Sequence, residues 1–113
     1  DSVLFCLQNQ GDMEAMNARN LAFLAGTAVA YGLTKEQALQ SITLNSAKIL
    51  GVDHLIGSLE VGKLASLVVS EGDLLDMKTN SVILAYINGR SINLNNFQNE
   101  LYKKYSNKLG IKE

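Results

Sequence analysis

The clearest indication of the fold comes from residues 57–69, which read Gly57-Ser58-Leu59-Glu60-Val61-Gly62-Lys63-Leu64-Ala65-Ser66-Leu67-Val68-Val69. The Glu-x-Gly-Lys part is typical of a tight turn, which Glu60 and Lys63 flank and shape. The apolar residues from Leu67 to Val69 predict a β-strand. This stretch therefore predicts a turn that leads directly into a strand.

The residues that follow continue the β pattern and end in a helix. Residues 82–87 are rich in β-branched side chains and predict a second strand, and Asn88-Gly89 predicts a hairpin to residues 90–94. Residues after Asn95 or Asn96, either of which could cap, predict a last helix. One apolar stripe recurs along that helix every four residues, formed by Phe97, Leu101, Tyr105 and Leu109.

The first half of the chain has a βα pattern. Residues 3–7 are continuously apolar, which predicts a strand buried on both faces, and residues 8–12 predict a polar loop. Residues 13–31 predict a helix that ends at Gly32. Thr34 to Gln37 form a capping box for the next helix, and Asn45 is expected to cap a short helix over residues 46–50 that Gly51 ends.

Length and composition restrict the class of protein. The 113 residues make one small domain or part of a larger one, and 47% of them are hydrophobic. The net charge of −1 gives no electrostatic basis for nucleic-acid binding, and the longest apolar stretch, residues 21–31, is too short to span a membrane. One cysteine excludes an internal disulfide. The start at Asp1-Ser2 favours a fragment or a processed precursor, so cytoplasmic and periplasmic locations both stay open.

Four segments, in order, resemble the C-terminal part of the amidohydrolase superfamily, with the imidazolonepropionase-related subgroup the most similar. Residues 57–69 resemble its Gly-Ser-Leu-Glu-Pro-Gly-Lys-x-Ala-Asp-Leu-Val-Val motif, with Ser66 in place of Asp. Residues 38–51 resemble Glu-Ala-Leu-x-x-x-Thr-x-Asn-Pro-Ala-Lys-x-Leu-Gly. Residues 72–75 resemble Gly-Asp-Pro-Leu, and residues 82–92 resemble the closing strand pair of the family. Each segment alone is a weak signal, whereas their order is specific.

The resemblance implies an α+β fragment of a larger fold. Residues 1–52 would be the last βα unit of a (β/α)8 barrel, with residues 3–7 as its eighth strand. Residues 53–94 would be the C-terminal part of a small β-sandwich, and residues 95–113 a terminal helix. Because active sites of such barrels lie at the C-terminal ends of the strands, Gln8, Asn9 and Gln10 are expected to border the substrate pocket.

The resemblance also implies a divalent metal, probably zinc in kind, bound by the full-length parent and not by this fragment alone. A metal-dependent hydrolase needs histidine and carboxylate ligands that lower the pKa of bound water. This chain has one histidine and no His-x-His. The family's eighth-strand aspartate aligns with Gln10 or Asn9, and Asp12 nearby is the candidate catalytic residue. The alternative for Asp12 is a loop carboxylate at a helix N-terminus.

Two other side chains have ordinary structural interpretations. His54 lies in a connection far from the expected pocket and is interpreted as a surface residue. Cys6 lies inside an apolar run, where a small buried hydrophobe is the usual role.

The leading hypothesis is the C-terminal portion of a metal-dependent amidohydrolase that hydrolyses a C–N bond in a cyclic amide, imide or dipeptide-like substrate. The alternative is a catalytically inactive amidohydrolase-like protein with a binding or structural role, which Gln10 favours. The expected partners are the remainder of the parent chain or another copy, as in a homo-oligomer, and a small-molecule substrate, with no nucleic acid and no membrane. An unpaired strand at residues 3–7 would expose backbone groups and favour such association.

Overall fold

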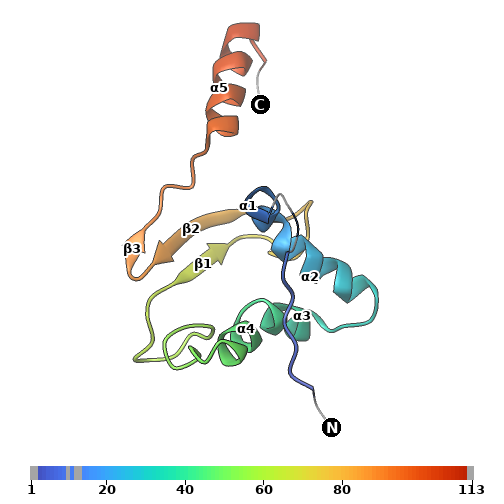
Figure 1. The fold of residues 1–113 in the computed structure, drawn as a ribbon. Helices are drawn as coiled ribbons and strands as arrows, with labels where there is room; N and C mark the ends of the chain where they lie inside the picture. The colour runs from blue at the N-terminus through green and yellow to red at the C-terminus, as the bar shows by residue number, and fades with distance from the viewer. Residues whose placement is uncertain (1–2, 10, 12–13, 112–113) are drawn as a thin grey trace.

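The computed structural model describes residues 3–9, 11 and 14–111. A group of short helices lies beside a small antiparallel sheet, and a C-terminal helix stands apart from both (Figure 1). The Cα radius of gyration is 16.6 Å, larger than the ~13 Å of a compact chain of this length.

The first helical stretch is interrupted rather than continuous. It consists of α1 (Glu14–Asn17), the 3₁₀ turn η1 (Ala18–Asn20) and α2 (Leu21–Ala30). The helix predicted over residues 13–31 is therefore confirmed apart from this turn and Met13, which lies outside the described residues. Gly32 follows with a φ of 115°, as expected of a glycine that ends a helix.

The next two helices are α3 (Lys35–Ser41) and α4 (Leu44–Ile49). The capping box is confirmed, because the Gln37 N–H donates to Thr34 Oγ1 and Gln37 Oε1 accepts from the Thr34 N–H. The prediction that Asn45 caps α4 is wrong. The helix already begins at Leu44, since the Ala47 N–H donates to the Thr43 carbonyl and places Asn45 inside the first turn.

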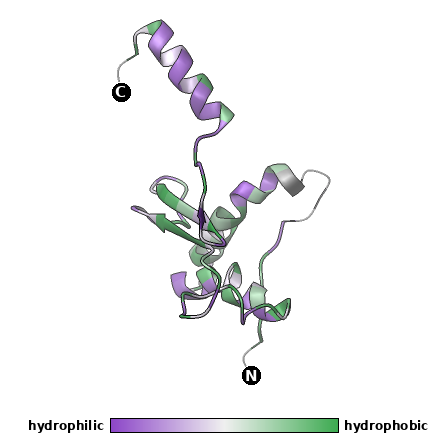
Figure 2. Ribbon diagram, turned by 90° about the vertical axis from the view of Figure 1, so that its left-hand side faces the viewer, coloured by the Kyte–Doolittle hydropathy of each residue, from purple (hydrophilic) through white to green (hydrophobic). Residues whose placement is uncertain are grey.

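The sheet contains β1 (Leu67–Ser70), β2 (Val82–Ile87) and β3 (Arg90–Ser91), all antiparallel and in chain order. Figure 2 shows that these strands are largely hydrophobic. Asn88 and Gly89 have φ values of 50° and 76°, so the predicted hairpin turn is confirmed. The turn is also fixed to the preceding loop, because its two N–H groups donate to Ser66 Oγ and the Ala65 carbonyl.

The turn before the sheet is held by one polar cluster. Lys63 Nζ lies 2.5 Å from Glu60 Oε2 and donates to Ser58 Oγ, which in turn donates to Glu60. Lys63 holds the pKa of the Glu60 carboxyl below its ordinary value, and the Ser58 hydroxyl adds to this effect. These residues therefore shape the turn, as their spacing predicts.

Residues 3–7 do not form the buried strand that their apolar run predicts. They are extended, and the Leu7 N–H donates to the Ser41 carbonyl at 3.2 Å, but among the described residues no strand pairs with them. Val3 is 82% exposed. A strand needs a neighbour for its backbone hydrogen bonds, and the described part of this chain supplies none. The description as a barrel unit is thus not realised by this chain alone.

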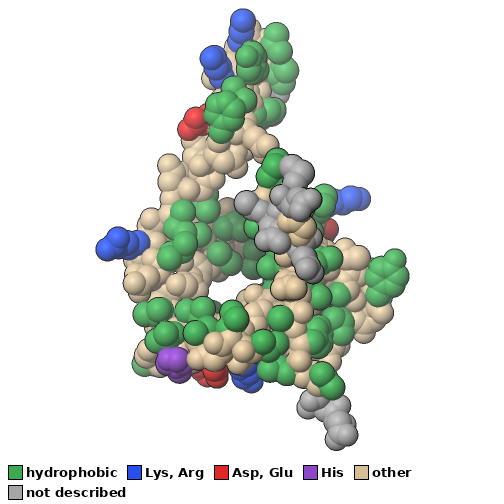
Figure 3. All heavy atoms as spheres, viewed as in Figure 1, with side chains coloured by type: hydrophobic (Ala, Val, Ile, Leu, Met, Phe, Trp, Pro, Cys, Tyr) green, Lys and Arg blue, Asp and Glu red, His purple; other side chains and the backbone are tan. Residues whose placement is uncertain are grey.

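The core is small and built from small side chains. Ala25 of α2 and Ala38 of α3 are fully buried, and Leu75 from the loop after β1 packs on both. Larger apolar side chains remain open on the sheet and around the helices (Figure 3). Gly26 permits the contact, because a Cβ there would lie 2.0 Å from the Leu75 carbonyl oxygen.

The C-terminal helix α5 (Phe97–Leu109) is well capped. Asn96, one of the two predicted caps, accepts the Asn99 N–H at 2.9 Å, and Gly110 ends the helix with a φ of 68°. In both ribbon views α5 stands clear of the sheet and the other helices (Figures 1 and 2). Its apolar stripe is therefore not part of the core.

We predict that Gly26→Ala destabilises the protein by ~1–3 kcal/mol, the usual cost of overpacking, because α2 must move away from the Leu75 carbonyl. Urea denaturation measures the change. Thr27→Ala on the exposed side of the same helix is the control and should leave stability nearly unchanged. Equal stability of the Gly26→Ala protein would show that the close contact is not required.

Candidate functional site

The predicted pocket residues lie where the extended segment meets the first helices. Gln8 is exposed and Asn9 is half-buried. Asn9 Nδ2 donates to the Asn17 carbonyl oxygen at 2.7 Å, which fixes the orientation of the Asn9 amide. Gln10 and Asp12 lie outside the described residues, so the structure does not place either of these candidates.

Asn9 lines a hollow of about 340 Å³ between the extended segment and α2. Its polar groups come from Asn9, Asn17, Asn20 and Thr27, and Phe23, Leu24 and Met77 supply the apolar wall. Gln8 is not part of the lining. Neutral amide and hydroxyl groups can orient a small polar ligand by hydrogen bonds, but they are poor general bases. Among the lining residues, none supplies a charge.

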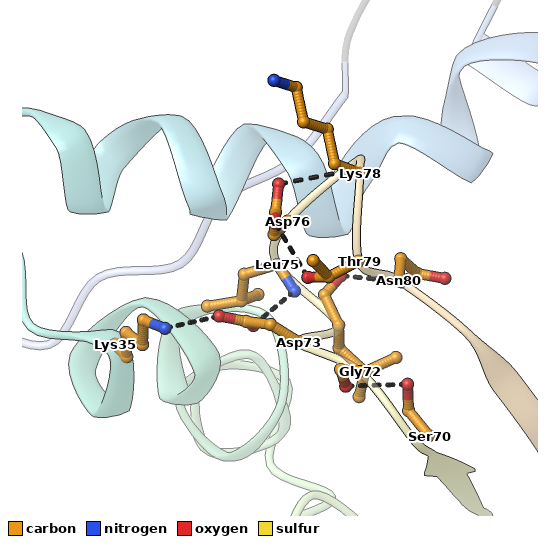
Figure 4. A network of polar contacts seen from close by, with 10 residues as sticks. Lys35, Ser70, Gly72, Asp73, Leu75, Asp76, Lys78, Thr79 and Asn80 are labelled. Carbon is orange, nitrogen blue, oxygen red and sulfur yellow. Dashed lines mark hydrogen bonds and ion pairs between the residues drawn. The ribbon is translucent and has the colours of Figure 1, made fainter.

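A second hollow of about 420 Å³ adjoins the first and shares Phe23, Thr27 and Met77 with it. Here Asp73, in the loop after β1, meets Lys35 at the start of α3 (Figure 4). Lys35 Nζ lies 2.6 Å from Asp73 Oδ2, and the Leu75 N–H donates to Asp73 Oδ1 at 3.0 Å. The pair links the helical group to the sheet across 38 residues of sequence.

The rest of this loop is held by Asp76 and Asn80. Asp76 accepts the Lys78 N–H at 3.1 Å and the Thr79 hydroxyl at 2.8 Å, and Asn80 Nδ2 donates to the Leu74 carbonyl (Figure 4). Gly72 is needed for this closure, because a Cβ there would lie 1.6 Å from the Thr79 carbonyl oxygen. These bonds give the loop one conformation and position Leu75 in the core.

Both carboxyl groups are held in the ionised form. The hydrogen bond from Lys35 lowers the pKa of Asp73, and the Leu75 N–H adds to this effect. The Thr79 hydroxyl, with the Lys78 N–H, lowers the pKa of Asp76. Asp73 in turn raises the pKa of Lys35. A general base at neutral pH works best with a pKa near the ambient pH, so these groups fit a structural link rather than proton transfer.

The sequence gave no sign of the link between Lys35 and Asp73. Residues 72–75 stood out as a motif and Lys35 as the first residue of a helix, but no spacing rule connects two side chains so far apart. Only the packing of α2 and α3 against the loop brings them together.

The described residues do not fit a hydrolytic metal centre. Within residues 3–9, 11 and 14–111, no three side chains of His, Cys, Asp or Glu gather in a way that could hold a metal ion. His54 is exposed in the connection after α4, as predicted for a surface residue, and Cys6 is a half-buried free thiol. In the same part of the chain, every helix is too short or too polar to cross a membrane.

Comparison with known proteins gives one consistent family. The model of the Amidohydrolase family matches residues 2–97. Adenine deaminase from Desulforamulus reducens is 31% identical over 78 residues, covering 69% of this chain and 13% of that protein. Imidazolonepropionase from Pseudomonas aeruginosa is 43% identical over 60 residues, covering 53% of this chain and 14% of that protein.

The same similarity extends to three dimensions. The crystal structure of an amidohydrolase from Thermotoga maritima has a TM-score of 0.70 and 40% sequence identity, over 80% of this chain and 23% of that one. The chain thus spans less than a quarter of each of these relatives.

We predict that Asp73→Asn lowers the urea midpoint slightly at pH 7, because Lys35 loses its anionic partner while Leu75 keeps an acceptor. A carboxyl whose pKa is lowered by folding stabilises above its ordinary pKa of 3.8, and this contribution is lost as the pH falls through the lowered value. The difference between the two proteins should therefore close at acidic pH.

Glu71→Gln, on the same loop, is the control for a change of one charge. It should not show the same pH-dependent difference. Denaturation curves of Asp73→Asn that match the original protein at pH 7 would contradict a stabilising link.

Proposed function

This chain belongs to the amidohydrolase family, and we propose that it is the C-terminal part of a metal-dependent hydrolase that breaks a C–N bond in a small molecule. The observation that carries the proposal is the family match over residues 2–97, which includes the four ordered motifs. Enzymes of this family are generally metal-dependent. The similar proteins named above act, by their names, on adenine and on an imidazolone, which are both nitrogen heterocycles.

The proposed substrate is therefore a small cyclic amide, imide or dipeptide-like molecule. The polar hollow beside α2 supports this class, because Asn9 is held by Asn17 with its Oδ1 left to accept from a substrate N–H. Gln8 and Gln10 are proposed to border the same pocket. None of these neutral groups supplies acid–base chemistry.

The metal ligands are proposed to belong to polypeptide other than the described residues, since those residues form no ligand cluster. When bound, such a metal activates water for attack. Within this chain, Asp12 is the proposed acid–base residue, because Gln10 stands where the family has its aspartate. A carboxylate at the start of α1 would instead favour the helix dipole.

The proposed division of the chain follows the same reasoning. Residues 1–52 would close a barrel, residues 53–94 would form part of a sandwich, and residues 95–113 would be a separate helix. Support comes from the extended apolar residues 3–7 and from the sheet, whose faces both carry exposed apolar side chains, among them Val69 and Leu84 on one face and Ile83 on the other.

A second candidate function is binding without catalysis. Gln10 at the aspartate position is the observation that favours it, because a neutral amide cannot take a proton from water. The two candidates differ in metal content and in turnover.

We expect the protein encoded by the complete gene to contain a divalent metal, such as zinc, and to hydrolyse cyclic amides. Metal analysis of the purified protein measures the first property. Removal of the metal by a chelator should abolish turnover, and its return should restore it. A metal-free protein without turnover on such substrates would support binding without catalysis.

Asp12→Asn should lower kcat at least ~100-fold if Asp12 transfers the proton. Steady-state kinetics on the metal-loaded protein measure the change, with metal content checked in parallel. Glu14→Gln removes one charge two residues away and is the matched control. Unchanged kcat in Asp12→Asn would assign Asp12 to the helix N-terminus alone.

A further inference from the structure

The helix α5 carries an uncovered apolar stripe. Phe97 is 72% exposed, Tyr105 50% and Leu109 70%, and Leu101 between them is half-buried. The residues share one side of the helix because they recur every four positions. Figure 3 shows the hydrophobic side chains of α5 open to solvent, with lysines near its end.

The helix is also distinct from the family fold. The family match ends at residue 97, where α5 begins. Residues 92–96 lead to it as an extended link after β3, and the ribbon views place the helix well away from the sheet of its own chain (Figures 1 and 2). The stripe thus does not cover the apolar surface of its own chain.

A matching apolar surface lies on the sheet. Val68, Ile83 and Ile87 point to the same face, because side chains alternate along a strand and Val68 pairs with Ala85. They are 50%, 44% and 62% exposed. The proposed sandwich needs only one face of the sheet, which leaves this face for a helix.

The charges of the two surfaces are opposite in sign. Residues 1–96 contain nine acidic and six basic residues, a formal charge of −3, whereas α5 carries three lysines and one glutamate, a charge of +2. Opposite charges favour encounter between such surfaces and set their orientation. The acidic part of another copy is therefore a suitable partner for α5.

We infer that α5 is an exchange arm, which packs its apolar stripe on the Val68–Ile83–Ile87 face of a second copy of this chain. A helix of 13 residues is ~20 Å long and covers only part of the ~1,000 Å² that a specific interface needs. A two-fold dimer makes the contact twice, because each copy supplies one arm and one face. The inference concerns assembly and does not depend on hydrolysis.

Analytical ultracentrifugation of the protein as its gene encodes it tests the inference. We expect a dimer at micromolar concentration. Leu101→Glu with Tyr105→Glu should raise the dimer dissociation constant at least ~30-fold, as expected when interface anchors are lost. Asn99→Glu adds charge to α5 away from the stripe and should leave the dimer intact.

Ile87→Lys provides an independent variant on the receiving face. It should weaken the dimer as strongly as the changes in α5, since it removes an apolar contact and repels the lysines of the arm. Circular dichroism confirms that each variant remains folded. A monomeric parent protein, which includes the case of α5 folding back on its own chain, would overturn the inference, as would a dimer that either variant leaves unchanged.

Discussion

The fold depends on the close approach of α2 to the loop that follows β1. Gly26 lies against the Leu75 carbonyl, and Ala25 and Ala38 enclose the Leu75 side chain. Only small residues allow helices and loop to meet at this distance, so a few alanines and one leucine connect the helical group to the sheet. The pair of Lys35 and Asp73 spans the same junction at its exposed edge. Hydrogen bonds from Asp76 and Asn80 then hold the loop in the shape that places Leu75.

This junction is too small to bury the apolar side chains that the chain carries. Val3, Leu4 and Phe5 are exposed on the extended segment, and both faces of the sheet carry open aliphatic residues. Monomeric soluble proteins rarely leave large apolar patches uncovered. The three uncovered surfaces have three proposed partners: a barrel for the extended segment, a sandwich layer for one face of the sheet, and the α5 arm of a second copy for the other.

Local signals in the sequence predicted local structure well. Thr34 and Gln37 form the expected capping box, and Asn88-Gly89 forms the expected turn, because both depend on residues next to one another. The strand over residues 3–7 was wrong for the chain alone, since a strand needs a partner that sequence composition does not supply. The helix start near Asn45 was wrong because the tight connection from α3 lets α4 begin one residue before it. The contact of Lys35 with Asp73 depends on tertiary packing, and the roles of Gln10 and Asp12 remain predictions.

Hydrogen exchange at the backbone amides of residues 3–7 tests the central claim most directly. If these residues evolved to complete a barrel, their amides should be strongly protected in the protein encoded by the complete gene, because parallel neighbours would accept their hydrogen bonds. In the chain of residues 1–113 the same amides should exchange rapidly, with Leu7 the exception through Ser41. Equally rapid exchange of residues 3–6 in both proteins would contradict the account.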